Sequence, residues 1–272
     1  MEEKKEEKVR ISVRNLVEFI LREGDLDSRQ GSTADKEAML LGGRIHRKIQ
    51  RQMGGGYHAE VPLQIVVPCE KLDIIVEGRA DGIIEEDGRT AVDEIKGILQ
   101  DLDLIKEPKK VHLAQAKCYA YIYASIKELS EIGVQMTYCQ METEEVKRFY
   151  QTFSCEELKK WFFDLVHRYE KWAVFQIEWR QKRNQSIKQV EFPFGYREGQ
   201  KDLVVSVYRS ILRKKKLFIQ APTGVGKTMA TVFPAVKAVG EGLANQIFYL
   251  TAKTITRTVA EKAFLTLKEQ GL

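Results

Sequence analysis

The sequence lacks the features that mark membrane and secreted proteins. No apolar stretch approaches the roughly 18 to 20 residues of a membrane span. The N-terminus, MEEKKEEKVR, is charged and no apolar run follows it, so it does not match a secretory signal. We therefore expect a soluble, cytoplasmic protein that has no membrane partner.

Cysteine is scarce and scattered, and no C-x-x-C pair occurs. This spacing argues against a zinc knuckle or a disulfide framework, so we expect reduced and mostly buried thiols. The sequence also contains no internal repeat and no low-complexity tract. A chain of 272 residues is long enough for two domains, each with its own core. The four cysteines are Cys69, Cys118, Cys139 and Cys155.

Charge is unevenly distributed along the chain, which carries a net charge of +5. Residues 1–184 contain 30 Lys and Arg against 33 Asp and Glu, whereas residues 185–272 contain 14 against 6. Such an excess suggests that the C-terminal part meets a polyanion such as nucleic acid. A merely solvated surface is the alternative, in particular for the basic run RKKK at 213–216.

Residue patterns predict an α/β domain over the first 184 residues. Helices are expected at 11–21, 39–52 and about 111–128, and a further long helix is expected after Ser154, which forms a capping box with Glu157. The polar stretch 181–188 is interpreted as a linker. Short β-branched segments predict strands at 58–67, 72–77, 82–85, 90–95, 134–140 and 146–153.

From residue 196 onward the pattern alternates between helix and strand. Strands are expected at 217–219 and 246–250, with helices at 229–238 and about 256–270. This order predicts a parallel βαβ arrangement.

The segment APTGVGKT at 221–228 follows the first of these strands and fits a phosphate-binding P-loop. Two glycines permit the tight turn, a lysine reaches the outer phosphates, and a threonine hydroxyl holds magnesium. Ala221 stands where the standard pattern has glycine. We expect ATP here, and a glycine-rich turn without a ligand is the alternative. The residues expected to contact the nucleotide are Gly224, Val225, Gly226, Lys227 and Thr228.

A hairpin is predicted around Asp87-Gly88, because this dipeptide favours a two-residue type I′ turn. With that turn at the centre, Asp81 lies opposite Glu94. A four-residue loop would shift this register by one residue. Two facing carboxylates repel unless a cation lies between them. Because side chains alternate along a strand, Lys96 shares a face with Glu94.

This set of acid, acid and lysine around a hard cation predicts metal-dependent cleavage of a phosphodiester. Taken singly, each piece also has an ordinary explanation. Glu-x-Lys on a strand is usually a surface ion pair, and Asp81-Gly82 could be a turn.

Five positions in this order resemble the PD-(D/E)xK nuclease superfamily, in particular its RecB-like branch. The resemblance covers roughly residues 10–180 and implies a restriction-endonuclease-like mixed sheet flanked by helices. The matching positions are His46 in GRIHRKIQ, Asp81 in EGRADGII, Glu94 to Lys96 in VDEIKG, and Gln115 with Tyr119 in HLAQAKCYAY.

The resemblance implies that His46, Asp81, Glu94 and the Ile95 carbonyl hold magnesium or manganese, with Lys96 as the catalytic lysine. It also implies that Gln115 and Tyr119 contact DNA or the motif residues beside it, although a helical histidine or tyrosine more often packs or faces solvent. Relatives with an iron-sulfur cluster have one cysteine upstream and three grouped downstream. This sequence shows no such group, so no cluster is expected within it.

The C-terminal segment, from about residue 190 to residue 272, is similar to the start of superfamily-two helicases of the DinG and XPD type. YREGQ at 196–200 resembles their Q-motif region, which implies that Gln200 reads the adenine edge. APTGVGKT matches motif I, and YLTAKTITRT at 249–258 matches motif Ia. The resemblance implies a RecA-like P-loop domain whose single-stranded DNA contacts are Thr251, Lys253, Thr254 and Arg257.

We therefore expect a nuclease-like domain at 10–184 and the beginning of a helicase ATP-binding domain at 185–272. The chain reaches Leu272 before an Asp-Glu motif or a second RecA-like lobe. It is expected to be the N-terminal part of a longer nuclease-helicase that acts in DNA repair on single strands or single-stranded ends. Two alternatives stay open: a nuclease-like domain that only binds and loads DNA, and a P-loop that uses nucleotide as a structural or switching ligand.

Overall fold

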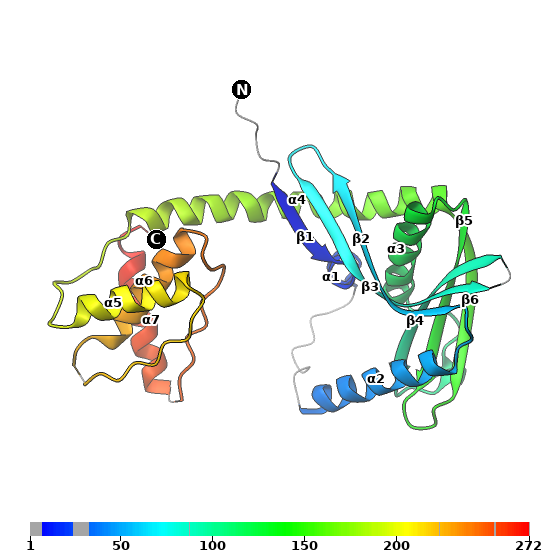
Figure 1. The fold of residues 1–272 in the computed structure, drawn as a ribbon, viewed down its shortest axis with the longest axis horizontal. Helices are drawn as coiled ribbons and strands as arrows, with labels where there is room; N and C mark the ends of the chain where they lie inside the picture. The colour runs from blue at the N-terminus through cyan, green and yellow to red at the C-terminus, as the bar shows by residue number, and fades with distance from the viewer. Residues whose placement is uncertain (1–6, 24–32, 87, 223, 253, 272) are drawn as a thin grey trace. The chain divides into compact units, whose positions relative to one another are not determined.

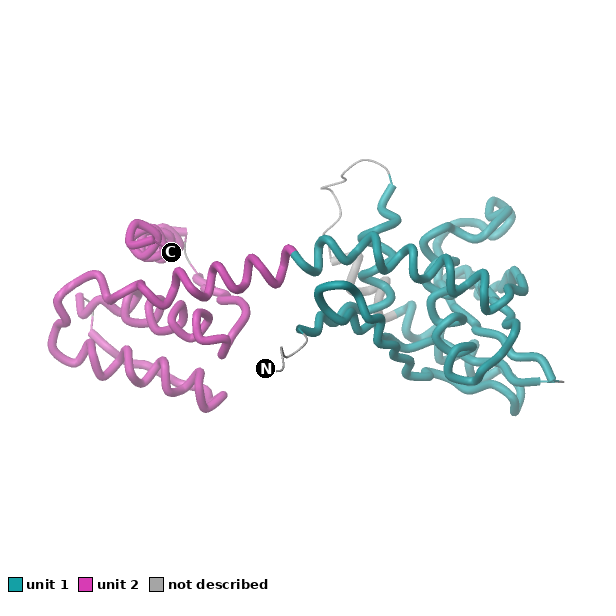
Figure 2. Tube along the Cα trace, turned by 90° about the horizontal axis from the view of Figure 1, so that it is seen from above, with its two compact units in different colours: residues 1–174 teal, residues 175–272 magenta. Residues whose placement is uncertain are grey.

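The computed structural model describes residues 7–23, 33–86, 88–222, 224–252 and 254–271. The chain divides into two compact units, unit 1 at residues 1–174 and unit 2 at residues 175–272 (Figure 2). The division falls within helix α4 (Cys155–Gln189), as does the boundary predicted at 184/185, which stays a prediction. None of the described helices combines the length and apolar character that crossing a membrane requires.

Unit 1 is built on a six-stranded mixed sheet, shown in Figure 1. The strand order is β1-β3-β4-β5-β6, and β2 pairs with β3. β1 runs parallel to β3 and β4 runs parallel to β5, whereas the other pairs are antiparallel. The predicted α/β class with a mixed sheet flanked by helices is therefore confirmed. The strands are β1 (Lys8–Ser12), β2 (Tyr57–Pro68), β3 (Asp73–Glu86), β4 (Arg89–Ile98), β5 (Glu131–Gln140) and β6 (Val146–Ser154).

Strand β3 has two different edges. Along one edge it pairs with β2 over residues 73–84. The other edge is shared, because β1 pairs with residues 73–77 and β4 pairs with residues 82–86. Residues 78–81 lie between these two partners and have no ladder partner on that edge within the described part of the chain. β1 also corrects the predicted helix at 11–21, which begins only at Val13 because the Ser12 hydroxyl accepts the N–H of Asn15 and caps it.

The β3–β4 hairpin has the predicted register. Its paired residues run from Gly82 with Asp93 to Glu86 with Arg89, which leaves residues 87 and 88 as the turn. Gly88 has φ +73°, a conformation that glycine adopts without strain, whereas Asp87 lies outside the described residues. The strands predicted separately at 72–77 and 82–85 form one continuous strand, so the alternative of a turn at residues 81–82 is wrong.

Helices cover the sheet of unit 1. α3 contacts β4 and β5, and α1 contacts α3 (Figure 1). Ala116, Ala120 and Ala124 recur every four residues and are fully buried, so their small side chains let α3 lie close to its neighbours. The helical elements are α1 (Val13–Ile20), α2 (Thr33–Gln52), the 3-10 turn η1 (Leu102–Leu104), α3 (Lys110–Lys127) and α4 (Cys155–Gln189).

Helix α4 begins where its capping signal predicts, since the Ser154 hydroxyl accepts the N–H of Glu157 at 3.2 Å. Its first half packs on unit 1, where the rings of Phe162 and Tyr121 lie 4.8 Å apart. The helix does not stop at the stretch predicted as a linker. Residues 181–188 are helical, because Ile187 and its neighbours belong to the apolar core of unit 2.

Unit 2 is helical within the described residues. It contains the end of α4 together with α5 (Gln200–Leu212), α6 (Lys227–Gly240) and α7 (Thr254–Lys268). Its core includes Ile187, Val204, Phe233, Val236 and Leu267.

The strands predicted at 217–219 and 246–250 are not formed in unit 2. A strand is held by hydrogen bonds to a neighbouring strand, and the described residues of unit 2 offer neither segment such a partner. Their side chains are consequently exposed, with 92% of Phe218 and 89% of Leu250 accessible. The prediction of a parallel βαβ arrangement in this segment is corrected accordingly.

Candidate functional site

The first candidate site lies where strands β3 and β4 separate. Their ladder ends at the pair of Gly82 and Asp93, one step before the predicted pair of Asp81 and Glu94. Beyond that point the Ile95 N–H donates to the Asp81 carboxylate at 2.8 Å instead of to the backbone of β3. Backbone N–H and C=O groups of one strand residue point to the same edge, so the Ile95 carbonyl is directed to the same side as Asp81.

The point where β3 and β4 separate is called the fork from here on. Three further predicted residues converge on it. The His46 Nδ1 atom, from α2, lies 3.2 Å from Asp81 Oδ1. The Lys96 ammonium donates to Glu94 Oε1 at 2.7 Å and to Gln115 Oε1 on α3 at 3.2 Å. α2 reaches the fork because its Ile45 and Ile49 pack against Ile95. The structure therefore brings together His46, Asp81, Glu94, Ile95, Lys96 and Gln115.

Burial of the Glu94 carboxylate costs free energy, and another interaction must offset this cost. The Glu94 side chain is 1% exposed, and its Oε2 atom has no hydrogen-bond partner among the described residues. Burial, followed by the negative charge of Asp81, raises the pKa of Glu94 to about 8, although Lys96 and His46 act in the opposite direction. Burial is the larger cause, so the ion pair with Lys96 does not fully offset the loss of hydration of the Glu94 carboxylate.

His46 is tuned toward its charged form by the same carboxylate. Burial lowers the pKa of His46, but the hydrogen bond and the charge of Asp81 together outweigh burial, and the net pKa is raised. Gln50, one helical turn after His46, donates to the backbone carbonyl of Asp81 at 2.9 Å. Two side chains of α2 therefore hold Asp81 in place.

The donor set of the fork fits a divalent cation. It contains two carboxylates, an imidazole nitrogen and a carbonyl directed to the same edge, and these are ligands that magnesium and manganese accept. The unpartnered Glu94 oxygen is the observation that supports this fit, because a cation would satisfy an atom that the described protein groups leave without a bond.

α3 contributes two more side chains, and sequence reasoning identified only one of them as part of the site. Tyr119 is 3% exposed, and its ring lies against Gly78 so closely that a Cβ there would meet the hydroxyl at 2.6 Å. His112, which was missed, contacts the Tyr138 hydroxyl at 3.1 Å. Burial and the charges of Lys96 and Lys109 lower its pKa to about 4. The sequence signal for His112 is its position three residues before Gln115, which places the two side chains on the same face of a helix.

Asp93, which precedes the motif glutamate, organises a buried network that the sequence did not indicate. Its carboxylate accepts from Thr137 at 2.5 Å, from Tyr57 at 3.1 Å and from Gln135 at 3.2 Å. The side chain is fully buried, and this burial raises its pKa. Gly82 makes room for the Tyr57 ring, since a Cβ there would lie 1.9 Å from the Tyr57 hydroxyl oxygen. The network fixes β4 beside β5 and links β4 to β2 across Gly82 of β3.

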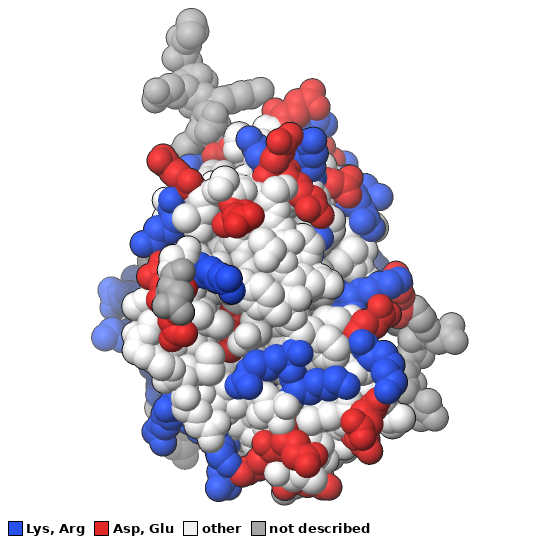
Figure 3. All heavy atoms as spheres, turned by 90° about the vertical axis from the view of Figure 1, so that its right-hand side faces the viewer, with Lys and Arg blue, Asp and Glu red and all other residues white. Residues whose placement is uncertain are grey.

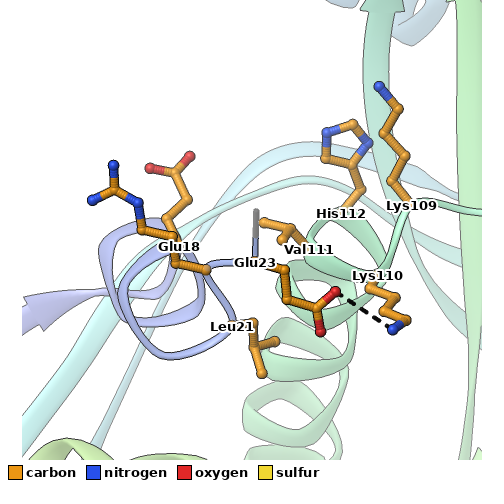
Figure 4. Close-up of a pocket in the computed structure, with 8 residues that line it drawn as sticks. Glu18, Leu21, Glu23, Lys109, Lys110, Val111 and His112 are labelled. Atoms are coloured by element: carbon orange, nitrogen blue, oxygen red, sulfur yellow. Dashed lines mark ion pairs between the residues drawn. The ribbon is translucent and has the colours of Figure 1, made fainter. Parts of the chain in front are cut away.

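An open pocket of about 590 Å³ lies at the start of α3 (Figure 4). On one side of it Lys110 forms an ion pair with Glu23 at 3.5 Å, and Lys109 and His112 stand on the other side. The pocket is close to the fork, because His112 contacts the hydroxyl of Tyr138, and Tyr138 is the ladder partner of Lys96. Its lining residues are Glu18, Leu21, Arg22, Glu23, Lys109, Lys110, Val111 and His112.

The surface charge on the face shown in Figure 3 does not mark a binding surface for nucleic acid. On the face shown in Figure 3, Lys and Arg side chains are interspersed with Asp and Glu around an uncharged central area. A continuous basic surface is typical of nucleic-acid binding, and this face does not carry one. In unit 2 the basic run at 213–216 is exposed, as its solvated alternative also predicts.

The second candidate site is the predicted P-loop in unit 2. Gly224 and Gly226 have φ of +89° and +75°, and α6 begins directly after them at Lys227. The Lys227 ammonium donates to the carbonyls of Ala221 at 2.9 Å and Pro222 at 2.6 Å, so it folds back over the loop. A loop with positive-φ glycines at a helix N-terminus presents backbone N–H groups to an anion. Val225 and Thr228 are half-buried beside it.

Gln200, expected to read an adenine edge, touches the P-loop directly. It is 5% exposed, accepts from the Arg197 N–H at 3.0 Å and donates to the Gly226 carbonyl at 3.4 Å. The Arg197 guanidinium also donates to the Gly224 carbonyl. The segment before α5 therefore supports the conformation of the loop.

The side chains expected to contact single-stranded DNA lie around the start of α7. Thr251 and Thr254 are exposed, and Arg257 forms an ion pair with Glu261 at 2.8 Å. Lys253 lies outside the described residues.

Three comparisons with known proteins found similarities, and the family match falls within unit 2. Residues 202–269 match the model of the DEAD/DEAH box helicase family. A curated relative, "Probable ATP-dependent helicase MJ0942" of Methanocaldococcus jannaschii, is 43% identical over 47 residues, which are 17% of this chain and 7% of that protein. The chain thus spans only a small part of this relative. The two matches support a helicase-like, ATP-dependent function.

This chain is also similar to a solved structure described as "Crystal structure of SSO0001". The match covers 58% of this chain and 75% of the solved chain. The identity is 18% and the TM-score is 0.39, so the likeness supports neither a fold nor a function.

Proposed function

We propose that this chain is part of an ATP-dependent DNA helicase of superfamily two, of the DinG and XPD type, with a metal-dependent DNA nuclease site in unit 1. The nuclease assignment rests on one observation. Asp81 and Glu94 meet where β3 and β4 separate, within contact of His46 and Lys96, and one carboxylate oxygen of Glu94 is buried without a partner among the residues that the structure describes. Magnesium or manganese would be held by His46, Asp81, Glu94 and the Ile95 carbonyl.

The protein groups of the fork suit phosphodiester cleavage. A divalent cation bound there would supply an activated water and neutralise phosphate charge. Lys96 is positioned by the oxygens of Glu94 and Gln115, and an ammonium has a third donor that can turn to a phosphate oxygen or to the attacking water. The DNA strand would pass the pocket that Lys109 and His112 line.

Unit 2 would couple ATP to movement on single-stranded DNA. Lys227 would exchange its bonds to loop carbonyls for bonds to the outer phosphates, and Thr228 would hold magnesium. Gln200 would contact the adenine while it braces Gly226. Exposed hydroxyls and cations at 251–257 suit a sequence-independent backbone contact. A role in DNA repair is consistent with a helicase that also cuts its product.

A cleavage assay tests the nuclease proposal. The chain is incubated with single-stranded and duplex DNA in the presence of Mg²⁺ or Mn²⁺, and products are resolved by size. We expect metal-dependent cleavage that Lys96→Ala and Asp81→Asn each reduce by at least about 100-fold, the magnitude that loss of one charge-stabilising group causes. The control is Lys160→Ala, since Lys160 is exposed and forms only a local ion pair with Glu156.

Two results would contradict the assignment of the site. One is equal cleavage by the wild type and Lys96→Ala. The other is DNA binding without cleavage under any divalent metal, which would favour a module that only binds and loads DNA.

A further inference from the structure

Three metal-ligating side chains converge outside both candidate sites, between the loop that follows β2 and helix α4. Cys69 lies directly after β2, where its N–H donates to the Leu72 carbonyl at 3.0 Å and closes a tight turn. His167 and Glu170 are three residues apart on α4 and so project from one face of the helix. The cysteine sulfur, a histidine ring nitrogen and a carboxylate oxygen all lie within 4.8 Å of one another.

The spacing of these atoms is close to that of ligands around one ion. Ligand atoms about 2.0 to 2.3 Å from a tetrahedral zinc ion lie roughly 3.3 to 3.8 Å from each other. His167 Nδ1 and Glu170 Oε2 are 3.5 Å apart, which already matches. The remaining separations, bounded by 4.8 Å, require side-chain movements of only about 1 Å.

The surroundings favour a cation at this point. The carboxylates of Glu170 and Asp73 both lie close enough to Cys69 to place negative charge on its sulfur. The nearby cations of α4 have other partners. Arg168 donates to the Ile20 carbonyl at 3.2 Å, and the Lys171 ammonium lies over the Trp172 ring. An exposed His–Glu ion pair contributes little to the free energy of unfolding, and a cysteine beside it does not strengthen the ion pair. Ion pairing therefore does not explain why the three side chains converge.

We propose that Cys69, His167 and Glu170 bind a zinc ion, with water in the fourth position, and that this ion ties the β2–β3 loop to helix α4. Thiolate and imidazole are the softer ligands that zinc prefers, whereas the hairpin fork offers mainly oxygen ligands suited to magnesium or manganese. The two sites therefore select different metals. Because its ligands come from segments far apart in sequence, the zinc ion stabilises the packing of α4 on unit 1.

Cobalt titration of the whole chain tests this site directly, since Co²⁺ replaces zinc and reports its ligands in the visible and near-ultraviolet spectrum. We expect a thiolate-to-cobalt charge-transfer band and the intense visible bands of a tetrahedral ion, both displaced by one equivalent of zinc. Cys69→Ser should abolish the charge-transfer band. His167→Ala and Glu170→Gln should each weaken cobalt affinity by at least about tenfold.

Two controls separate this site from other thiols and from the fork. Cys155→Ser, at the start of the same helix and also partly buried, should leave the spectrum unchanged. Asp81→Asn should likewise leave it unchanged, so the result does not depend on the proposed nuclease site. His167 is 55% exposed, so His167→Ala keeps the test valid even if Cys69→Ser folds poorly. A wild-type chain without a charge-transfer band, or a band that survives in Cys69→Ser, would overturn the proposal.

Discussion

Glu94 is an ionisable residue buried in unit 1, with a side chain that is 1% exposed. The folded chain holds a proton at Glu94 up to about pH 8, whereas the unfolded chain releases it near pH 4.5. The folded state therefore binds more protons between these values, and the free energy of unfolding falls as pH rises from about 4.5 to about 8. Without metal, this residue makes the fold less stable at neutral and alkaline pH.

Glu94→Gln should remove this pH dependence, because glutamine is neutral throughout. In EDTA we expect the variant to match the wild type at pH 5 and to exceed it at pH 8.5 by about 1–3 kcal/mol, the cost of an unsatisfied buried polar group. Urea unfolding at the two pH values measures the difference. Glu131→Gln, an exposed acid at the start of β5, is the control. A variant that loses stability with pH as the wild type does would show that Glu94 is not the cause.

The contacts of Asp81, Glu94 and Lys96 could be predicted from the sequence, because all three residues lie on one hairpin whose turn fixes their relative positions. The contacts of His112 and the Tyr57–Asp93 pair could not be predicted in this way. They join elements distant in sequence, and their distances depend on how α3 and β2 pack, which no local spacing determines.

At the scale of elements, the end of α4 in unit 2 is bonded to a lysine of another helix. The Lys237 ammonium of α6 donates to the carbonyls of Ile187, Lys188 and Val190 at 3.1 to 3.3 Å. The last carbonyls of a helix have no partner within the helix and carry partial negative charge. Lys237 therefore caps α4 from a neighbouring helix.

Lys237→Met should keep the apolar stem of the side chain and remove the cap. We expect a loss of about 1–2 kcal/mol in the stability of unit 2, in line with a charged group at a helix C-terminus. Faster hydrogen exchange of amides around 187–190 and in α6 would report it, with the exposed Lys262→Met as control. Unchanged exchange at these amides would mean that water replaces the ammonium at no cost.

The helices of unit 2 follow from the sequence more closely than its expected strands do. α6 and α7 lie within a few residues of their predicted positions, since an amphipathic helix satisfies its own backbone. The segments 217–219 and 246–250 are apolar enough for strands, but a strand also needs a partner edge. Composition alone does not reveal whether the described chain supplies that edge.

For the whole molecule, the two candidate sites belong to different compact units. The fork lies in residues 1–174 and the P-loop in residues 175–272, each with its own core. The sequence indicated this separation through the change in motif type and charge. It did not indicate that a single helix continues through the division.

Lys227→Ala should therefore affect one activity and not the other. We expect ATP binding, measured by fluorescence of a labelled nucleotide, to weaken by about 10- to 100-fold, which corresponds to the loss of a charge-assisted hydrogen bond. Metal-dependent cleavage of DNA by the same variant should stay at the wild-type rate. A parallel loss of cleavage would show that the two sites are coupled, and Lys262→Ala serves as the control for surface charge.

The pairing register of the β3–β4 hairpin has a consequence for comparing related chains. A slip of one residue in this pairing would turn every side chain of one strand to the opposite side of the sheet relative to its partner. An alignment would still display both acids and the lysine, although they could no longer meet. Transfer of this chemistry to another sequence should therefore require the same pairing register as well as the same motif letters.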